Sequence, residues 1–224
     1  MLKFSYKECG RMLNSPEFCK HARHGGFTMS ILRGLCVLIL VIQFVPAEAA
    51  DDFDPEKVSQ QVKIFDTLVK YPAPSWMDER LLKASEYYRD SKPNTFIFEQ
   101  IPKGEKFESW TKLYAVTGTK APQLDFKGFV QASLGVFAQA CGRDNLKIQT
   151  VMAEEKKAMV VIFCEDSPNG PTQFGYGPGK GEVTVMLFAR PFETHIKIYQ
   201  HWRGERFDAT DKSSWPVSET RFAR

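Results

Sequence analysis

The amino-acid sequence predicts an α+β domain. It contains an antiparallel sheet of about six strands, one main amphipathic helix packed on one face, and an additional N-terminal helix. Two patterns support this prediction. Short β-branched and aromatic runs alternate with turn residues, and the segment 126–141 repeats apolar residues at helical spacing. The 224 residues are 43% hydrophobic and 25% charged, which suits one packed domain and excludes a disordered tail or a protein with several membrane spans.

The segment 29–49 has the features of a secretory signal peptide. It contains a basic residue, an apolar run over 35–45, a proline, and an Ala-Glu-Ala motif that predicts cleavage between Ala49 and Ala50. The apolar run has about eleven residues, whereas a membrane-spanning helix needs roughly twenty. An uncleaved signal anchor over 34–45 is the alternative.

Residues 1–28 precede the signal peptide and are interpreted as an extension of the gene model or as disordered. Two cysteines and two histidines lie within this segment, but their spacing does not match a zinc finger, so no metal site is predicted. The whole net charge of +3 arises in residues 1–49. The rest of the chain is formally neutral, so no nucleic-acid partner is expected.

The exported chain is predicted to begin with a helix over 54–70. Asp54 followed by proline is typical of a helix start. Apolar residues then recur at helical spacing, at Val58, Val62, Phe65 and Val69. We therefore assign 50–82 as an N-terminal helix with a linker, and 83–203 as the α+β domain.

The strands of this domain are expected between clusters of turn residues. They cover about 84–89, 95–101, 110–117, 146–152, 158–164, 182–190 and 195–203. The main helix covers 126–141 and ends where Gly142 can serve as the C-terminal cap. The tail, 204–224, is expected to be irregular, with Trp215 packed back onto the domain.

Only Cys141 and Cys164 remain once the leader is removed. Two cysteines in an oxidising compartment indicate one disulfide, and two buried free thiols are the alternative. The bond would join the main helix to the strand 158–164, so the hairpin ending at Cys164 is expected to pack beneath that helix.

The glycine-rich loop 175–181 contains Lys180 and has the composition of a phosphate-binding loop. A true phosphate-binding loop of that kind opens a helix, however, and here a strand follows. We therefore interpret the segment as a flexible hairpin loop.

The last strand places His195 and His201 on one face with Lys197, Tyr199 and Arg203. The two histidines are roughly 20 Å apart along the strand, too far to bind one metal ion. A solvated sheet face is the expected setting.

An aromatic patch on this face is the weak candidate for ligand binding, and packing in the core is the alternative for its aromatic side chains. The candidate residues are Trp110, Tyr114, Lys180, His195, Tyr199 and His201. No catalytic residue, metal or cofactor is predicted.

The order of these landmarks resembles a group of uncharacterised exported proteins of proteobacteria, particularly soil alphaproteobacteria. The resemblance covers about 84–203. It lies in the turn Pro102-Lys-Gly-Glu105, Trp110-Thr111, Cys141-Gly142, the strand ending at Cys164, and Glu182-Val-Thr-Val. It implies the fold and the disulfide but carries over no catalytic residue.

We therefore expect an exported bacterial protein that acts as a non-enzymatic periplasmic or secreted binding or interaction domain. Its partner is expected to be a protein or small molecule of the cell envelope. Contact with the membrane is expected only through the signal segment, if that segment is not cleaved. A signal-anchored subunit of an envelope complex is one alternative, and a hydrolase using His195, Tyr199 and His201 is another.

Overall fold

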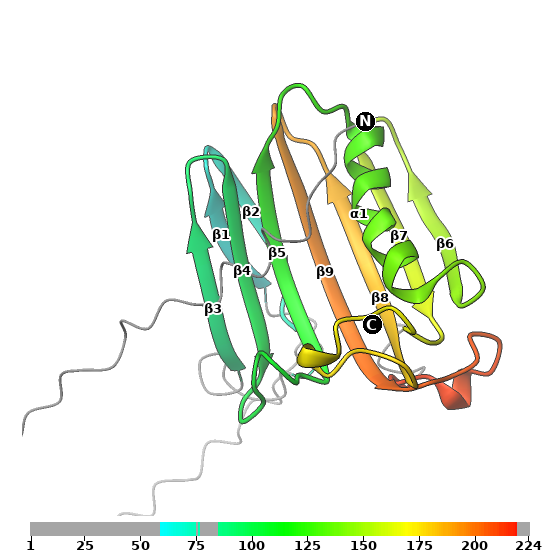
Figure 1. The fold of residues 1–224 in the computed structure, drawn as a ribbon. Coiled ribbons are helices and arrows are strands. Elements are labelled where there is room, and N and C mark those ends of the chain that lie inside the picture. The colour runs from blue at the N-terminus through cyan, green and yellow to red at the C-terminus, as the bar shows by residue number, and fades with distance from the viewer. Residues whose placement is uncertain (1–58, 75, 77–84, 219–224) are drawn as a thin grey trace, which may run out of the picture. The chain divides into compact units, whose positions relative to one another are not determined.

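The main element of the fold is a seven-stranded sheet. The computed structural model describes residues 59–74, 76 and 85–218. The strand order is β3-β4-β5-β9-β8-β7-β6, and every pair is antiparallel (Figure 1). The strands are β3 (Ser85–Ser91), β4 (Thr95–Pro102), β5 (Lys112–Lys120), β6 (Leu146–Ala153), β7 (Lys157–Cys164), β8 (Lys180–Ala189) and β9 (Thr194–Glu205). The predicted α+β class is confirmed, with seven strands in this sheet where about six were expected.

One helix, α1 (Phe126–Cys141), covers part of one face of this sheet (Figure 1). The Asp125 carboxylate caps its first turn by accepting a hydrogen bond of 2.6 Å from the amide of Gly128. Phe126 and Phe129 pack against apolar side chains of β7 and β8, namely Ala158, Val160, Ile162, Met186 and Phe188. The expectation of one main helix on one face is confirmed, and we call this the helix face.

The N-terminal helix predicted over 54–70 is wrong over its described part. Residues 59–72 form a hairpin of β1 (Ser59–Ile64) and β2 (Thr67–Pro72), and residues 54–58 lie outside the described residues. Every second side chain points inward: Gln60, Val62 and Ile64 on β1, and Thr67, Val69 and Tyr71 on β2. Val62 and Val69 are direct partners across the two strands, so an apolar spacing that fits a helix also fits a hairpin.

The hairpin packs on the opposite face of the sheet. Ile64 and Tyr71 are buried against Phe96, Tyr114 and Ile196. The backbone of β5 approaches closely here, because a Cβ atom on Gly118 would lie 2.2 Å from Cγ2 of Ile64. A glycine at this position therefore lets the hairpin lie directly on the sheet.

The C-terminal stretch covers the other half of that opposite face. It includes the short 3-10 helix η4 (Lys212–Ser214). Phe207, Trp215 and Val217 pack against the buried Phe163 and Trp202. The ring centroids of Trp215 and Phe163 are 4.9 Å apart, which confirms that Trp215 packs back onto the domain.

A disulfide links the helix to the sheet. Cys141, the last residue of α1, is bonded to Cys164, the last residue of β7, with Cα atoms 5.6 Å apart. Both cysteines are fully buried. The hairpin of β6 and β7 therefore lies beneath α1, as the predicted pairing required.

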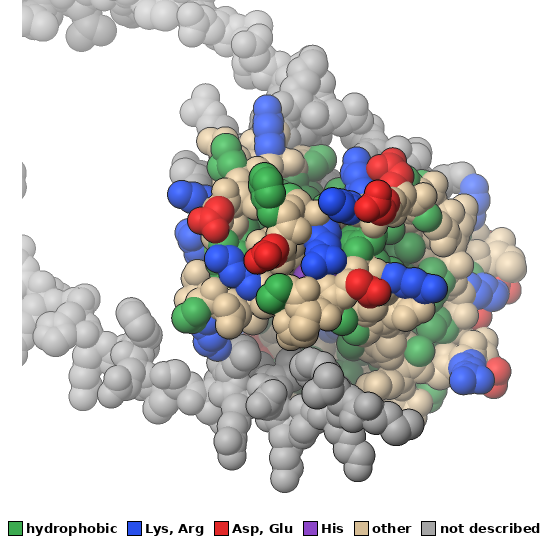
Figure 2. Space-filling view, turned by 90° about the horizontal axis from the view of Figure 1, so that it is seen from above, with side chains coloured by type: hydrophobic (Ala, Val, Ile, Leu, Met, Phe, Trp, Pro, Cys, Tyr) green, Lys and Arg blue, Asp and Glu red, His purple; other side chains and the backbone are tan. Residues whose placement is uncertain are grey.

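Side chains of both charges are interspersed at the end of the molecule seen in Figure 2. Acidic, basic and apolar side chains alternate over the described residues of this end, and neither sign gathers into one patch.

Candidate ligand-binding site

Three charged or ionisable side chains meet on the helix face of β8 and β9. Oε1 of Glu182 lies 2.7 Å from Nδ1 of His201, and Oε2 accepts a hydrogen bond of 2.6 Å from Nε of Arg203. The hydroxyl of Thr184 lies 2.7 Å from the same Nδ1. Burial alone would raise the pKa of Glu182, but His201 and Arg203 and their hydrogen bonds lower it to about 2. Glu182 is therefore an ionised carboxylate that contacts both the His201 imidazole and the Arg203 guanidinium.

Arg203 lies between two aromatic rings. Its guanidinium carbon is 3.5 Å from the ring centroid of Trp110 and 4.3 Å from that of Tyr176. The hydroxyl of Tyr176 donates a hydrogen bond of 3.0 Å to Sγ of Cys164. The stacked arginine therefore connects the buried carboxylate to the disulfide.

The imidazole of His201 is enclosed by rings from three different elements. Its centroid is 4.8 Å from Tyr199 on β9, 5.7 Å from Trp110 in the loop before β5, and 6.0 Å from Phe137 on α1. The solvated sheet face expected for His195 and His201 is wrong, because His195 is fully buried and His201 is only 8% exposed. The reason is that α1 lies over this face of β9, where Phe129 stacks on His195 and Phe137 stacks on His201. Strand alternation does not reveal that arrangement.

Two further charged groups flank Tyr199 on the same face. Glu99 on β4 is opposite Ala115 on β5, and Ala115 is in turn opposite Tyr199 on β9. Lys197 is two residues from Tyr199 along β9 and shares its face. Its ammonium lies 5.8 Å from the Tyr199 ring and 5.9 Å from the Phe129 ring.

Neither Glu99 nor Lys197 has a hydrogen-bond or ion-pair partner among the described residues, and both are half-buried. Burial raises the pKa of Glu99 to about 7 and lowers the pKa of Lys197. We call Glu99, Trp110, Phe137, Lys197, Tyr199 and His201 the helix-side cluster. It places two oppositely charged groups, neither with an ion-pair partner among the described residues, on the helix side of the sheet with three aromatic side chains and an imidazole.

The structure brings together three of the six residues predicted as ligand-binding. Trp110, Tyr199 and His201 belong to the helix-side cluster. Tyr114 lies on the opposite face, where it packs against Tyr71 of the hairpin with ring centroids 5.9 Å apart.

The other two predicted residues, His195 and Lys180, lie apart from the cluster. His195 is stacked on Phe129 at 4.5 Å, and its Nε2 lies 3.0 Å from the carbonyl oxygen of Leu124. Burial lowers the pKa of His195, and the Leu124 carbonyl opposes that shift. Lys180 begins β8 and pairs with Glu205. The two groups are thus occupied by contacts within the fold.

Sequence reasoning did not assign Glu99 or Glu182 to a site, and it placed Lys197 and Arg203 only on a solvated face. A signal for Glu99 was present, because it is the one charged residue within an otherwise apolar and amide run, Phe96-Ile-Phe-Glu-Gln-Ile101. A charge inside a buried strand calls for a partner or a function. Its proximity to Tyr199 depends on the pairing of β4, β5 and β9, which no local pattern shows.

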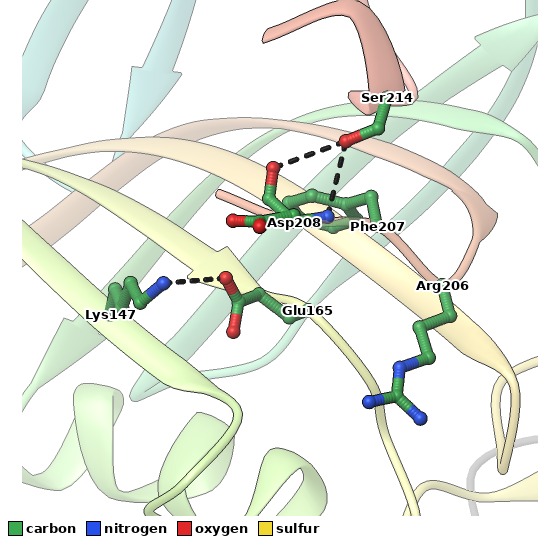
Figure 3. A pocket seen from close by; sticks show the side chains of 6 residues that line it. All are labelled: Lys147, Glu165, Arg206, Phe207, Asp208 and Ser214. Carbon is green, nitrogen blue, oxygen red and sulfur yellow. Dashed lines mark hydrogen bonds and ion pairs between the residues drawn. The ribbon is translucent and has the colours of Figure 1, made fainter. Parts of the chain in front are cut away.

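A hollow lies at the end of the sheet beside β6, the end of β7 and the C-terminal stretch (Figure 3). It has a volume of about 500 Å³ and is lined by Lys147, Glu165, Arg206, Phe207, Asp208 and Ser214. Its charges are already engaged. Glu165 accepts hydrogen bonds from Nζ of Lys147 at 2.6 Å and from the Ala209 amide at 2.7 Å, and Arg206 pairs with Asp166 at 3.6 Å. These pairs hold the C-terminal stretch in place, so the helix-side cluster is the stronger candidate site.

Within 59–74, 76 and 85–218, no three histidine, cysteine or acidic side chains are grouped so that they could hold a metal ion. No helix in this part of the chain is long and apolar enough to span a membrane.

The fold and the helix-side cluster together describe an α+β protein with one helix on a seven-stranded antiparallel sheet. No protein-family model matches the chain, and no curated protein matches its sequence. Two solved structures are distantly similar. One is a mutant of protein Mog1, with a TM-score of 0.41, 12% identity, and coverage of 73% of this chain and 87% of that one. The other is the Ran-binding protein Mog1p of Saccharomyces cerevisiae, with a TM-score of 0.40, 12% identity, and coverage of 73% and 86%. A likeness this distant carries no argument about function.

Proposed function

We propose that the chain is an exported, non-enzymatic binding domain that takes a small charged ligand at the helix-side cluster. The observation that carries this proposal is the pair of oppositely charged groups, Glu99 and Lys197, that flank Tyr199 without an ion-pair or hydrogen-bond partner among the described residues. A half-buried charge without a partner lowers the stability of a domain. Groups of this kind with perturbed pKa values concentrate at functional sites.

The disulfide supports the export part of the proposal. Cys141–Cys164 is a buried bond, and such bonds persist in the periplasm and outside the cell but are rare in a reducing cytosol. The signal peptide expected over 29–49 points to the same compartment. Cell fractionation distinguishes this form from the alternative, an envelope subunit anchored by 34–45, because only the anchored form stays with the membrane.

The test is native mass spectrometry of the protein recovered from its own cell envelope. We expect a mass that starts at Ala50, lacks two hydrogens because of the disulfide, and carries a non-covalent adduct. The Lys197→Met variant should lose the adduct. Lys147→Met is the matched control, because it removes a lysine from the hollow of Figure 3, and it should keep the adduct.

Three results would overturn the proposal. Wild-type protein without any adduct would show that the protein carries no small ligand. An adduct lost in Lys147→Met and kept in Lys197→Met would move the site to the hollow shown in Figure 3. An adduct kept in both variants would show that the ligand binds neither at the helix-side cluster nor in that hollow.

A hydrolase is the second candidate, and one contact favours it. Oε1 of Glu182 lies 2.7 Å from Nδ1 of His201, an arrangement also found where a carboxylate orients a histidine that acts as a general base. The test is hydrolysis of a panel of chromogenic esters. Activity that His201→Ala abolishes, and that His195→Ala retains at equal stability, would support it; a wild-type protein inactive on the whole panel would count against it.

A further inference from the structure

The relative position of Glu99 and Lys197 restricts which ligand could satisfy both. They lie on β4 and β9, which are separated only by β5, and they differ by two residues in register. Strand spacing and rise place their Cα atoms about 12 Å apart. Both side chains leave the sheet on the same face, and Tyr199 shares a cross-strand row with Glu99 and a strand with Lys197.

The charges of the two groups are complementary to a single kind of ligand. A ligand with an ammonium group and a carboxylate would give both Glu99 and Lys197 a partner and would offset both burial costs. A ligand with only one charge would leave the other protein group buried and unpaired, which is the costly arrangement. On β5, Ala115 is directly opposite Glu99 and has no polar group, and Thr117 is directly opposite Lys197 and has a hydroxyl but no charge.

The aromatic members of the cluster suit the rest of such a molecule. Tyr199 lies beside Lys197 and stacks edge-on against His201, and Trp110 approaches the same imidazole. Trp110 is half-buried, so part of its ring is exposed. Aromatic faces bind apolar side chains and also attract an ammonium group.

We infer that the ligand of the helix-side cluster is a small zwitterion of the free amino acid type, whose ammonium group pairs with Glu99 and whose carboxylate pairs with Lys197. This inference rests on the proposed function, because it names the chemical class of ligand at the same site. Each charged end of the ligand therefore has one protein group as its partner.

The experiment is titration calorimetry of the purified protein, stripped of adducts by unfolding and refolding with the disulfide intact. The probes are the twenty common amino acids, followed by the amide and the N-acetyl derivative of the one that binds most tightly. The amide keeps only the ammonium group, and the N-acetyl derivative keeps only the carboxylate. We expect each derivative to bind at least about tenfold more weakly than the parent amino acid.

The variants assign each end of the ligand to one residue. Glu99→Gln should weaken the parent at least about tenfold and leave the N-acetyl derivative within about twofold, because that derivative has no ammonium group to lose. Lys197→Met should weaken the parent equally and leave the amide unchanged. Lys147→Met should change none of these affinities.

The failures of the two proposals are distinguishable. If the envelope adduct is lost in Lys197→Met but no amino acid binds, or if both derivatives bind as tightly as the parent, the zwitterion is wrong and the binding site stands. If the two variants weaken all three probes alike, the charge assignment is wrong. If neither adduct nor amino acid binds, both proposals fall.

Discussion

Glu99 is a single carboxyl whose titration should be visible in the stability of the whole domain. Burial raises its pKa in the folded state to about 7, from an ordinary value of 4.5. Folded protein therefore holds a proton that unfolded protein has released between these two pH values. The free energy of unfolding should fall as the pH rises from about 4.5 through about 7, by about 1–3 kcal/mol.

The check is urea denaturation across that pH range for wild type and Glu99→Gln. The glutamine cannot ionise, so this part of the pH dependence should disappear in the variant. Identical slopes for the two proteins would show that the Glu99 carboxyl titrates normally.

Glu182 is the opposite case, a carboxylate held ionised by its neighbours. Its pKa is about 2, below the ordinary 4.5, so its contribution to stability is complete above about pH 4.5 and is lost as the pH falls towards 2. Glu182→Gln should destabilise the domain by about 3–5 kcal/mol at neutral pH, because Arg203 is left buried without its partner.

The matched control for Glu182→Gln is Glu205→Gln, which lies two residues beyond Arg203 in the same strand pair. Glu205 pairs with Lys180 in an exposed setting, so its loss should cost about 0–1 kcal/mol. Denaturation midpoints of the two variants check the difference. Equal midpoints would mean that burial of the Glu182 pair adds nothing to its strength.

At the scale of one element, the hairpin of β1 and β2 depends on the close approach at Gly118. Gly118→Ala should destabilise wild type by about 1–3 kcal/mol, because the added methyl overlaps Ile64. Ile64→Ala should cost about 2–5 kcal/mol alone, since Ile64 is fully buried. In the Ile64→Ala background, Gly118→Ala should cost almost nothing.

The four denaturation curves of this cycle measure the coupling, and additive costs would refute the contact. Gly135→Ala on α1 is the control. No atom lies within 4 Å of its added methyl, and alanine favours a helix, so that variant should be as stable as wild type or more so.

The elements of the main sheet were predictable because each of its strands is bounded by turn residues that lie next to it in sequence. β9 shows this best, since its alternation correctly separated His201 and Tyr199 from Ile198 and Trp202. The hairpin was not predictable from the spacing of Val62 and Val69, because that spacing fits both one face of a helix and a cross-strand pair in a β-hairpin.

The candidate site was predictable only in part, for a reason of register. Tyr114 and Tyr199 are on adjacent strands, but Gln200, not Tyr199, is the partner of Tyr114. One residue of offset therefore puts Tyr114 on the other face. Pairing between β5 and β9 joins segments far apart in the chain, and local patterns do not determine it.

At the scale of the whole molecule, the disulfide should contribute a measurable part of the stability. Cys141 and Cys164 are 23 residues apart, and closing a loop of this length stabilises a fold by about 3 kcal/mol in the chain-entropy model. Replacing both cysteines with serine should lower the free energy of unfolding by about that amount. Wild type in reducing agent should match the variant, and a midpoint unchanged by reduction would contradict the prediction.

The strand order also has a consequence for how the chain folds. Strands β3 to β5 form one run of consecutive hairpins, and β6 to β9 form another, which holds the disulfide. The two runs meet only where β5 pairs with β9, between residues such as Lys112 and Trp202 that are far apart in sequence. Closing so long a loop is entropically expensive and slow. Each run can therefore assemble early, and Glu99 reaches Lys197 only when the last long-range pairing closes the sheet.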